Sequence, residues 1–322
     1  MWCVQFDQPG GPEVLQWREL PDREPDAGEV AVELAAAGLN FIDTYQRSGL
    51  YNVPLPYVTG SEGAGTVVAV GAGVDAPLVG DRVAWATCPG SYATRIVAPA
   101  ERLVAVPDGV TDEQAAAIPL QGMTAHYLVR DVYPLGPGDR CLIHAGAGGV
   151  GLLLVQLAKR CGAEVFTTVG SPDKAELATA AGADHVILYR DVDFAEAVEA
   201  IAGRRPLDVV YDGVGRAVFE PSLGLLRRRG MMVTFGNASG PVEPLSPLAL
   251  SANGSLFLTR PTLFDYVAER ADLERRAADL FEWLAAGELD VRIGARFPLR
   301  AAADAHRALE ARQTTGKVLL VP

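Results

Sequence analysis

Residues 140–163 read RCLIHAGAGGVGLLLVQLAKRCGA, and this stretch decides the fold. Its first five residues form a short apolar run that predicts a β-strand. Three glycines follow in GxGxxG spacing: Gly146, Gly148 and Gly151. A helix with a broad apolar surface is expected to begin at about Val150, so that backbone N–H groups and the positive helix end can hold a pyrophosphate. Together with a second apolar run at 164–169, the stretch predicts a βαβ unit that binds a dinucleotide.

The end of the second predicted strand indicates which dinucleotide is bound. An acidic side chain at this position accepts hydrogen bonds from the adenosine ribose and selects NAD. This chain instead has Gly170 and Ser171 there, followed by Pro172, Asp173 and Lys174. The hydroxyl of Ser171 and the amine of Lys174 favour a 2′-phosphate, so we expect NADPH. The carboxylate of Asp173 is the one nearby group that argues against this cofactor.

Length, composition and charge narrow the class of protein. At 322 residues, with 49% hydrophobic and 21% charged residues, the chain suggests about two globular domains. Its net charge of −12 disfavours a nucleic-acid partner. The N-terminal MWCVQFDQPGG does not resemble a signal peptide, and no apolar run is long enough to cross a membrane. Four scattered cysteines without CxxC spacing suit reduced thiols, so we expect a cytoplasmic protein, and four histidines without ligand spacing predict no metal site.

The pattern of predicted elements changes near residue 122. Before it, short β segments divided by Gly and Pro predict a compact β-barrel, at 2–6, 14–19, 29–37, 65–70, 82–85, 92–97 and 103–106. TDEQ at 111–114 resembles a capping box that begins a helix. From 123 to 260, strands alternate with helices, which predicts an open parallel sheet. Its ligand-binding rim is expected to contain the glycine turn, residues 170–174, Tyr189, Gly213 and residues 235–237. We expect residues 261–322 to return to the first domain, giving domains 1–122 with 261–322, and 123–260.

With these motifs in view, the chain resembles the medium-chain dehydrogenase/reductase superfamily. GSEGAGTVVAVGAGVDAPLVGDRV at 60–83 is similar to the superfamily signature. Six further motifs resemble the zinc-independent quinone oxidoreductase branch, which is similar to zeta-crystallin: NFIDTYQRSGLY (40–51), LQGMTAHYL (120–128), HAGAGGVG (144–151), VYDGVG (210–215), FGNASG (235–240) and LTRP (258–261). The fold class that the resemblance implies is α/β, with a GroES-like β-barrel catalytic domain and a Rossmann doubly wound parallel-sheet domain for NADPH.

The same resemblance bears on metal chemistry and activity. Two positions that hold a catalytic zinc in the related alcohol dehydrogenases carry Asn40 and Ser61 here, and neither is a usual zinc ligand. A hydride acceptor that needs no metal, such as a quinone or a conjugated carbonyl, is therefore the expected small-molecule substrate. The resemblance implies an NADPH-dependent quinone reductase. Two alternatives stay open: an NADPH-dependent alkenal or enone reductase, and a non-enzymatic NADPH- or RNA-binding protein.

The candidate site residues come from the rim and from the matched motifs. For the substrate we expect Asn40, Tyr45, Tyr51 and Gln121, with Asn40 and Gln121 orienting a carbonyl oxygen. For the cofactor, the pattern and the resemblance together imply Asn40, Phe41, Ile42, Asp43, Tyr45, Tyr127, Gly146, Gly148, Gly149, Val150, Gly151, Gly170, Ser171, Lys174, Tyr189, Gly213, Phe235, Gly236, Asn237, Ala238, Thr259, Arg260 and Arg312. The nicotinamide is expected beside residues 40–45. No residue plainly supplies a proton.

Several residues keep a second interpretation. Lys317 is an alternative to Arg312 for phosphate contact, and His126 lies in an apolar context typical of an interior histidine. The run Arg227 to Arg229 resembles a helix C-terminus, where cations complement the helix dipole. The resemblance also implies a homodimer that forms by extension of the nucleotide-domain sheet through residues 255–258.

Overall fold

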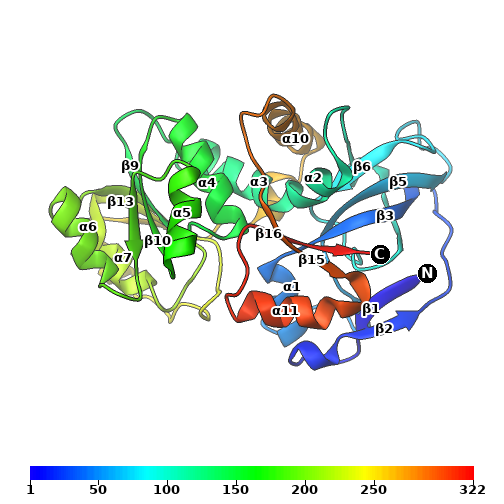
Figure 1. Cartoon of the computed structure of the whole chain (residues 1–322), viewed down its shortest axis with the longest axis horizontal. Coiled ribbons are helices and arrows are strands. Elements are labelled where there is room, and N and C mark those ends of the chain that lie inside the picture. Colours follow the sequence, from blue (N-terminus) through cyan, green and yellow to red (C-terminus); the bar gives the residue numbers. More distant parts are fainter. The chain divides into compact units, whose positions relative to one another are not determined.

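The computed structural model describes residues 1–322 and divides the chain into two units (Figure 1). The first unit contains Met1–Met123 and Tyr266–Pro322, and the second contains Thr124–Asp265. None of the helices combines the length and the apolar character that a membrane span requires.

The first unit is built from two β-sheets. Seven strands form the larger one in the order β15-β16-β3-β5-β6-β8, with β7 also paired to β3, and three form the smaller one in the order β2-β1-β4. Their bounds are β1 Trp2–Phe6, β2 Gln16–Glu19, β3 Glu29–Leu39, β4 Tyr57–Val58, β5 Glu62–Val70, β6 Arg82–Trp85, β7 Arg95–Pro99, β8 Val104–Ala105, β15 Ile293–Pro298 and β16 Lys317–Val321. The helices are α1 Phe41–Ser48, α2 Asp112–Ala117, α10 Arg270–Ala285 and α11 Ala302–Glu310, with short turns η1 Pro12–Val14, η2 Ala100–Arg102 and η4 Leu299–Ala301.

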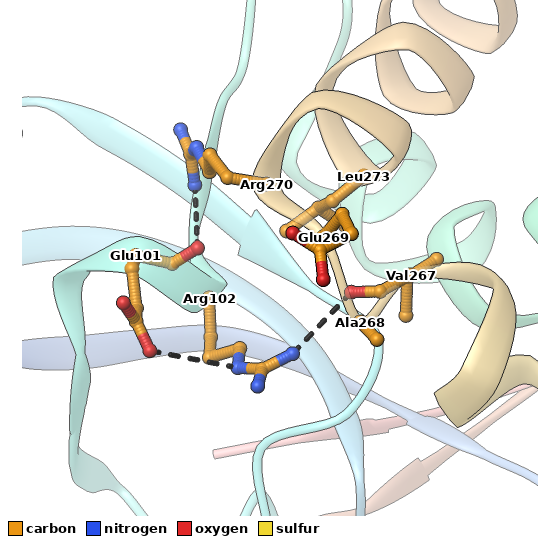
Figure 2. Close-up of a pocket in the computed structure, with 7 residues that line it drawn as sticks. All are labelled: Glu101, Arg102, Val267, Ala268, Glu269, Arg270 and Leu273. Atoms are coloured by element: carbon orange, nitrogen blue, oxygen red, sulfur yellow. Dashed lines mark hydrogen bonds and ion pairs between the residues drawn. The ribbon is translucent and has the colours of Figure 1, made fainter.

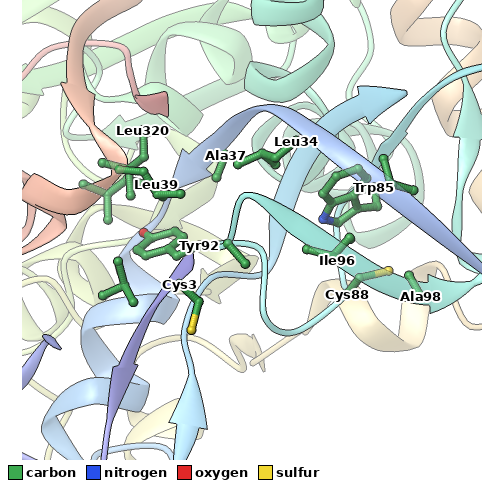
Figure 3. Close-up of a cluster of buried hydrophobic side chains, with 14 of the residues drawn as sticks. Cys3, Leu34, Ala37, Leu39, Trp85, Cys88, Tyr92, Ile96, Ala98 and Leu320 are labelled. Atoms are coloured by element: carbon green, nitrogen blue, oxygen red, sulfur yellow. The ribbon is translucent and has the colours of Figure 1, made fainter. Parts of the chain in front are cut away.

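Strand β3 organises this unit. It pairs with β7 through 29–33, with β16 through 37–39, and with β5 along most of its length. The pairing of β3 with β5 has two register irregularities. Such bulges bend a strand, which allows β3 to pair with β5, β7 and β16 along different parts of its length. The core inside the sheet contains Leu34, Trp85, Tyr92 and Leu320 (Figure 3). The indole N–H of Trp85 donates to Ser91 Oγ at 2.8 Å, so the largest core side chain has its polar atom paired.

The second unit is a six-stranded sheet in the order β11-β10-β9-β12-β13-β14. Every neighbouring pair is parallel. Its strands are β9 Arg140–His144, β10 Glu164–Val169, β11 His185–Leu188, β12 Leu207–Asp212, β13 Leu226–Thr234 and β14 Phe257–Thr259. The helices are α4 Gly149–Arg160, α5 Pro172–Ala180, α6 Phe194–Ala202, α7 Phe219–Leu225 and α8 Pro247–Ala252. Helices α3 Pro119–Tyr127 and α9 Leu263–Tyr266 run across the two unit boundaries, and the π-helical turn η3 Leu128–Val132 follows α3.

The strand order identifies this sheet as a Rossmann fold. Read in chain order, the six strands lie as 3-2-1-4-5-6, which is the doubly wound arrangement. Helices α4 and α5 cover one face and α6 and α7 the other (Figure 1). The direction of winding reverses between β9 and β12, and ligands of such sheets bind at the carboxyl ends of the strands beside this point. The α/β fold class with a Rossmann parallel-sheet unit beside a β-rich unit, expected from the sequence, is confirmed.

The capping-box motif at 111–114 correctly predicted the start of helix α2, whereas the charge run at 227–229 was misinterpreted. Thr111 and Gln114 form the expected capping box, in which each backbone N–H donates to the other side chain, at 3.2 and 3.0 Å. The prediction that Arg227 to Arg229 end a helix is wrong. Helix α7 ends at Leu225, and the arginines lie in β13. Helix α7 passes directly into β13 without a loop. The exposed arginines at the start of β13 therefore follow the helix closely enough in sequence to resemble its C-terminus.

Candidate functional site

The turn between β9 and α4 is closely packed and leaves no room for side chains at two of its glycines. A Cβ on Gly146 would lie 2.0 Å from Thr167 Oγ1, and one on Gly151 would lie 2.3 Å from the Ala145 carbonyl oxygen. Ala145 itself has a φ of +58°, a left-handed conformation in a non-glycine residue. Gly148 is the N-cap of the 12-residue helix α4, and no acidic residue lies in its first turn. The turn therefore presents backbone N–H groups and a positive helix end, which fit a pyrophosphate.

His144, the last residue of β9, links the strand before this turn to two neighbouring elements. Its Nδ1 lies 3.0 Å from Thr168 Oγ1 and its Nε2 lies 2.9 Å from Ser222 Oγ, so the ring joins β9 to β10 and to α7. The ring is fully buried, and burial lowers the pKa of His144 to about 3. It is therefore a neutral structural residue at neutral pH.

The tip of β10 holds the residues expected at the adenosine 2′-phosphate. Ser171 is the N-cap of α5, Lys174 lies in the first turn of that helix, and Tyr189 directly follows β11. A Cβ on Gly170 would lie 2.8 Å from the Tyr189 hydroxyl and 3.4 Å from Arg190 Nε. Arg190 was missed in the sequence, although its place directly after Tyr189 at a strand tip was a usable signal. A hydroxyl-rich, basic corner of this kind suits a phosphate better than a ribose hydroxyl pair.

The ends of β12 and β13 approach each other through two glycines. A Cβ on Gly236 would lie 2.3 Å from the Gly213 carbonyl oxygen, and one on Gly213 would lie 3.1 Å from the Phe235 ring. The Ala238 N–H donates to the Gly213 carbonyl at 3.3 Å. Arg260 Nη1 donates to the Gly236 carbonyl at 3.1 Å. These predicted cofactor residues are thus brought together at the carboxyl ends of β12 and β13.

Asp212 fixes the loop that carries Gly213. Its Oδ1 accepts hydrogen bonds from the backbone N–H groups of Val214 at 2.7 Å and Gly215 at 2.8 Å. Burial raises the pKa of Asp212 to about 6, although these hydrogen bonds act in the opposite direction. Asn237 follows Gly236 on the adjacent loop, and Thr259 on β14 pairs with Val233.

In the first unit, Asn40 lies in a buried polar network. Its Nδ2 donates to Glu62 Oε2 at 2.8 Å and to the Gly38 carbonyl at 3.2 Å. Its Oδ1 accepts from Lys317 Nζ at 2.9 Å and from Gln121 Nε2 at 3.0 Å. Both ends of the Asn40 amide are therefore occupied by protein groups.

Lys317 does not take the phosphate role that was left open for it. Its side chain is fully buried and forms an ion pair with Glu62, whose side chain is also fully buried. Desolvation lowers the pKa of Lys317, and the Glu62 charge opposes this shift. The alternative that Lys317 replaces Arg312 at a phosphate is wrong, because the ammonium is enclosed among carboxylate and amide oxygens. Arg312 is exposed after α11, with a φ of +59°.

Asp43 connects helix α1 to the barrel core. Its Oδ2 accepts from the Asn40 backbone N–H at 2.8 Å, which forms a capping box, and from the Tyr92 hydroxyl at 2.8 Å. Ser61 Oγ lies 3.5 Å from the other oxygen of Asp43. Complete burial raises the pKa of Asp43 to about 7. Its observed contacts are those of a structural capping residue.

Asn40 and Ser61, which the family resemblance matches to zinc-ligand positions, are part of this network, Asn40 through its amide and Ser61 through its hydroxyl. No group of three or more His, Cys, Asp or Glu side chains in the chain has a geometry that could hold a metal ion. Amide and hydroxyl groups are poor zinc ligands compared with thiolate and imidazole.

Aromatic side chains on and after α1 form a short series. The rings of Phe41 and Tyr45 are 6.1 Å apart, and the rings of Tyr45 and Tyr51 meet edge to face at 5.3 Å. Tyr51 is 36% exposed, whereas Tyr45 is buried. Ile42, which lies between Phe41 and Tyr45 in sequence, is half-buried. A planar ring can stack beside such a series.

Two other candidates are buried in the second unit. Tyr127, the last residue of α3, is 1% exposed, and so is its neighbour His126. Burial of His126 agrees with the interior histidine that its apolar context suggested.

A separate surface pocket lies beside the N-terminus of α10 (Figure 2). Its arginines are engaged with backbone carbonyls: Arg102 Nη1 donates to Val267 at 3.3 Å, and Arg270 Nη1 donates to Glu101 at 2.8 Å. None of the predicted site residues lines this pocket.

Comparisons with known proteins agree with this architecture. Residues 26–108 match the alcohol dehydrogenase GroES-like domain, and residues 149–283 match the zinc-binding dehydrogenase domain. The chain is 48% identical over 321 residues to a quinone oxidoreductase of Pseudomonas aeruginosa, with 99% of each chain covered. It is 41% identical over 322 residues to a 2-haloacrylate reductase of a Burkholderia species, covering 97% of this chain and 96% of that protein.

Among solved structures, the crystal structure of an Escherichia coli quinone oxidoreductase complexed with NADPH superposes with a TM-score of 0.98. The two chains are 44% identical, and each is covered completely.

Proposed function

Because the chain belongs to the quinone oxidoreductases of the medium-chain dehydrogenase/reductase superfamily, we propose that it is an enzyme that reduces quinones with NADPH. The observation that carries the cofactor assignment is the pairing of a glycine turn with a β10 tip that has Gly170 and Lys174 in place of a carboxylate. The quinone oxidoreductase of Escherichia coli was crystallised with NADPH, which supports the same assignment.

The chain's own residues bind and orient the cofactor. The backbone N–H groups at the start of α4 hold the pyrophosphate, while Ser171, Lys174 and Tyr189 surround the 2′-phosphate. Bound NADPH supplies a hydride from its nicotinamide ring. The proposal assigns this reacting end to the residues around Asn40 and Phe41. Catalysis is then mostly a matter of positioning.

For the substrate, we propose that Tyr45 and Tyr51 provide an aromatic surface for a planar quinone. Gln121, in the same unit, donates to Asn40, the N-cap of the helix that carries Tyr45. The zinc-ligand positions carry an amide and a hydroxyl, so the acceptor must be activated by its own conjugation. Quinones and conjugated carbonyls meet this condition.

The test is NADPH and NADH oxidation with 1,4-benzoquinone and 9,10-phenanthrenequinone, run beside Lys174→Ala. We expect a strong preference for NADPH, and a rise in the KM for NADPH of about 10-fold or more in the variant. Lys159→Ala is the matched control, because Lys159 lies in the last turn of α4 and pairs with Asp184 at 2.7 Å. Loss of the NADPH preference in the control, or its retention in Lys174→Ala, would contradict the assignment.

A second candidate activity is reduction of a conjugated carbon–carbon double bond. The observation that favours it is the 41% identity to the 2-haloacrylate reductase. A 2-alkenal and 2-chloroacrylate belong in the same assay. A kcat/KM for either that exceeds those for both quinones would make this reaction the principal one.

We also propose a cytoplasmic homodimer. All four cysteines are unpaired, which suits a reducing compartment. Strand β14 lies at the edge of its sheet, and its Phe257 is 57% exposed, so a second copy could extend the sheet there. Light scattering should give twice the 34.0 kDa chain mass, and Phe257→Lys should reduce it to one chain.

A further inference from the structure

Gln121 carries a buried acceptor that the protein does not satisfy. Its side chain is only 8% exposed, and its Nε2 donates to Asn40 Oδ1 at 3.0 Å. The other end, Oε1, is buried and has no hydrogen-bond partner. Unpaired buried acceptors are uncommon in folded proteins because they are costly, so each calls for a donor from outside the protein.

The orientation of the Gln121 amide is set, through Asn40, by the charged side chains of Lys317 and Glu62. Lys317 can only donate, so it requires the oxygen of Asn40, whereas ionised Glu62 can only accept, so it requires the nitrogen. The Asn40 amide therefore has one allowed orientation. With the Asn40 oxygen facing Gln121, Gln121 must present its own nitrogen to it. A flipped Gln121 would place two amide oxygens against each other.

We propose that Gln121 Oε1 accepts a hydrogen bond from a donor on the ring end of the bound ligands, and that Lys317, through Asn40, is its positioning residue. This inference rests on the proposed function. A quinone carries only carbonyl acceptors and cannot satisfy Gln121 Oε1. The two donors on the reacting rings are the carboxamide N–H of the nicotinamide and the phenolic O–H of the hydroquinone product.

The first experiment separates these two donors. Calorimetry measures the binding of NADPH and of its reduced 3-acetylpyridine analogue, in which a methyl group replaces the carboxamide nitrogen, to the wild type and to Gln121→Met. In parallel, the inhibition constant of 1,4-hydroquinone is measured against 1,4-benzoquinone. Methionine keeps the length of the side chain and removes the acceptor.

If the nicotinamide is the donor, Gln121→Met weakens NADPH binding by about 2- to 10-fold and leaves the analogue unchanged. If the product is the donor, the inhibition constant of hydroquinone rises by that factor while the KM for benzoquinone stays constant. Unchanged affinity for NADPH and hydroquinone overturns the proposal, since the acceptor is then satisfied by water. A rise in the benzoquinone KM alone also overturns it, because Gln121 would then act as a donor.

The second experiment tests the positioning role of Lys317. The double variant Lys317→Met with Glu62→Gln removes both charges, and the neutral amide at 62 accepts either orientation of Asn40. We expect the double variant to lose the same affinity as Gln121→Met, for NADPH relative to its analogue or for hydroquinone, whichever that variant weakened. Cooperative unfolding should be retained. A folded double variant with the full wild-type affinity would overturn the positioning role.

These outcomes are distinct from failure of the proposed function. If the wild type oxidises no NADPH with any quinone, the quinone reductase proposal fails, whereas the calorimetric comparison of NADPH with its analogue still reports on Gln121.

Discussion

Replacing Lys317 by methionine should destabilise the first unit strongly, because it leaves a carboxylate buried without its counter-ion. Both side chains of the Lys317–Glu62 pair are 0% exposed. Removal of one partner of such a pair typically costs about 3–5 kcal/mol. Glu62 keeps two donors, the Leu120 N–H at 2.7 Å and Asn40 Nδ2 at 2.8 Å. We therefore expect the lower end of this range, about 3 kcal/mol.

The double variant with Glu62→Gln should recover most of that loss. With the ion pair removed, the desolvation cost of both ions disappears, and replacing a buried pair by well-packed neutral groups is often neutral or stabilising. Because Glu62→Gln keeps a polar group in the network, we expect a net loss of about 1 kcal/mol or less for the double variant. The double variant should therefore be more stable than Lys317→Met alone by about 2 kcal/mol or more.

The assay is urea unfolding followed by tryptophan fluorescence. Trp2, Trp17, Trp85 and Trp283 all lie in the first unit, so the signal reports on the unit that contains the pair. A loss below about 1 kcal/mol in Lys317→Met, or an equal loss in single and double variants, would refute the reasoning, since either result means that Glu62 is not held as a buried charge.

Three further predictions concern other parts of the molecule. Gly146→Ala should weaken NADPH binding at least 10-fold by calorimetry, because its Cβ would lie 2.0 Å from Thr167 Oγ1, whereas Gly224→Ala, with nothing within 4 Å, should bind normally. His144 has a folded pKa of about 3, below its unfolded value, so its contribution to stability is complete above about pH 6.5 and is lost as the pH falls toward 3. By circular dichroism in urea, His144→Asn should therefore lose less stability than the wild type between pH 7 and 4.5, by up to about 3 kcal/mol, and parallel pH curves would argue against a buried neutral ring. Asp43 has a folded pKa of about 7, above its unfolded value, so the cost of ionising it appears as the pH rises from about 4 to 7. Asp43→Asn should accordingly be more stable, relative to the wild type, at pH 8 than at pH 5, and the reverse order in urea unfolding would show that the carboxylate is ionised at little cost.

The nucleotide-binding unit could be predicted well because its signals are local. Glycine spacing, an apolar helix and alternating strands lie within short windows of the chain, and the helix expected at Val150 begins one residue earlier, at Gly149. The misassigned Arg227 to Arg229 show the limit of the same reasoning. A charge run does not reveal whether the preceding helix is followed by a loop or passes directly into a strand.

The polar network of the first unit could not be predicted, because its members are distant in sequence. Lys317 and Glu62 are 255 residues apart, and Gln121 lies 81 residues from Asn40. Asn40 and Gln121 were predicted to contact the substrate and Lys317 a phosphate, but nothing in the sequence indicated that these side chains contact one another. Only the folding of β16 beside β3 brings the lysine to the asparagine.

The network also explains why a side chain at a zinc-ligand position need not be available to substrate. Asn40 directs its nitrogen to a carboxylate and its oxygen to an ammonium, so its amide is held by groups on β5 and β16. The buried cation is balanced by Glu62, so it orients amides without presenting a net charge to the reacting ligand. In the proposed site, the group that this network offers to the ligand is the Gln121 amide oxygen, and its direction is set by the Lys317–Glu62 ion pair through Asn40. Such a site favours a ring that brings its own donor, and it leaves activation of the hydride acceptor to the acceptor's conjugation.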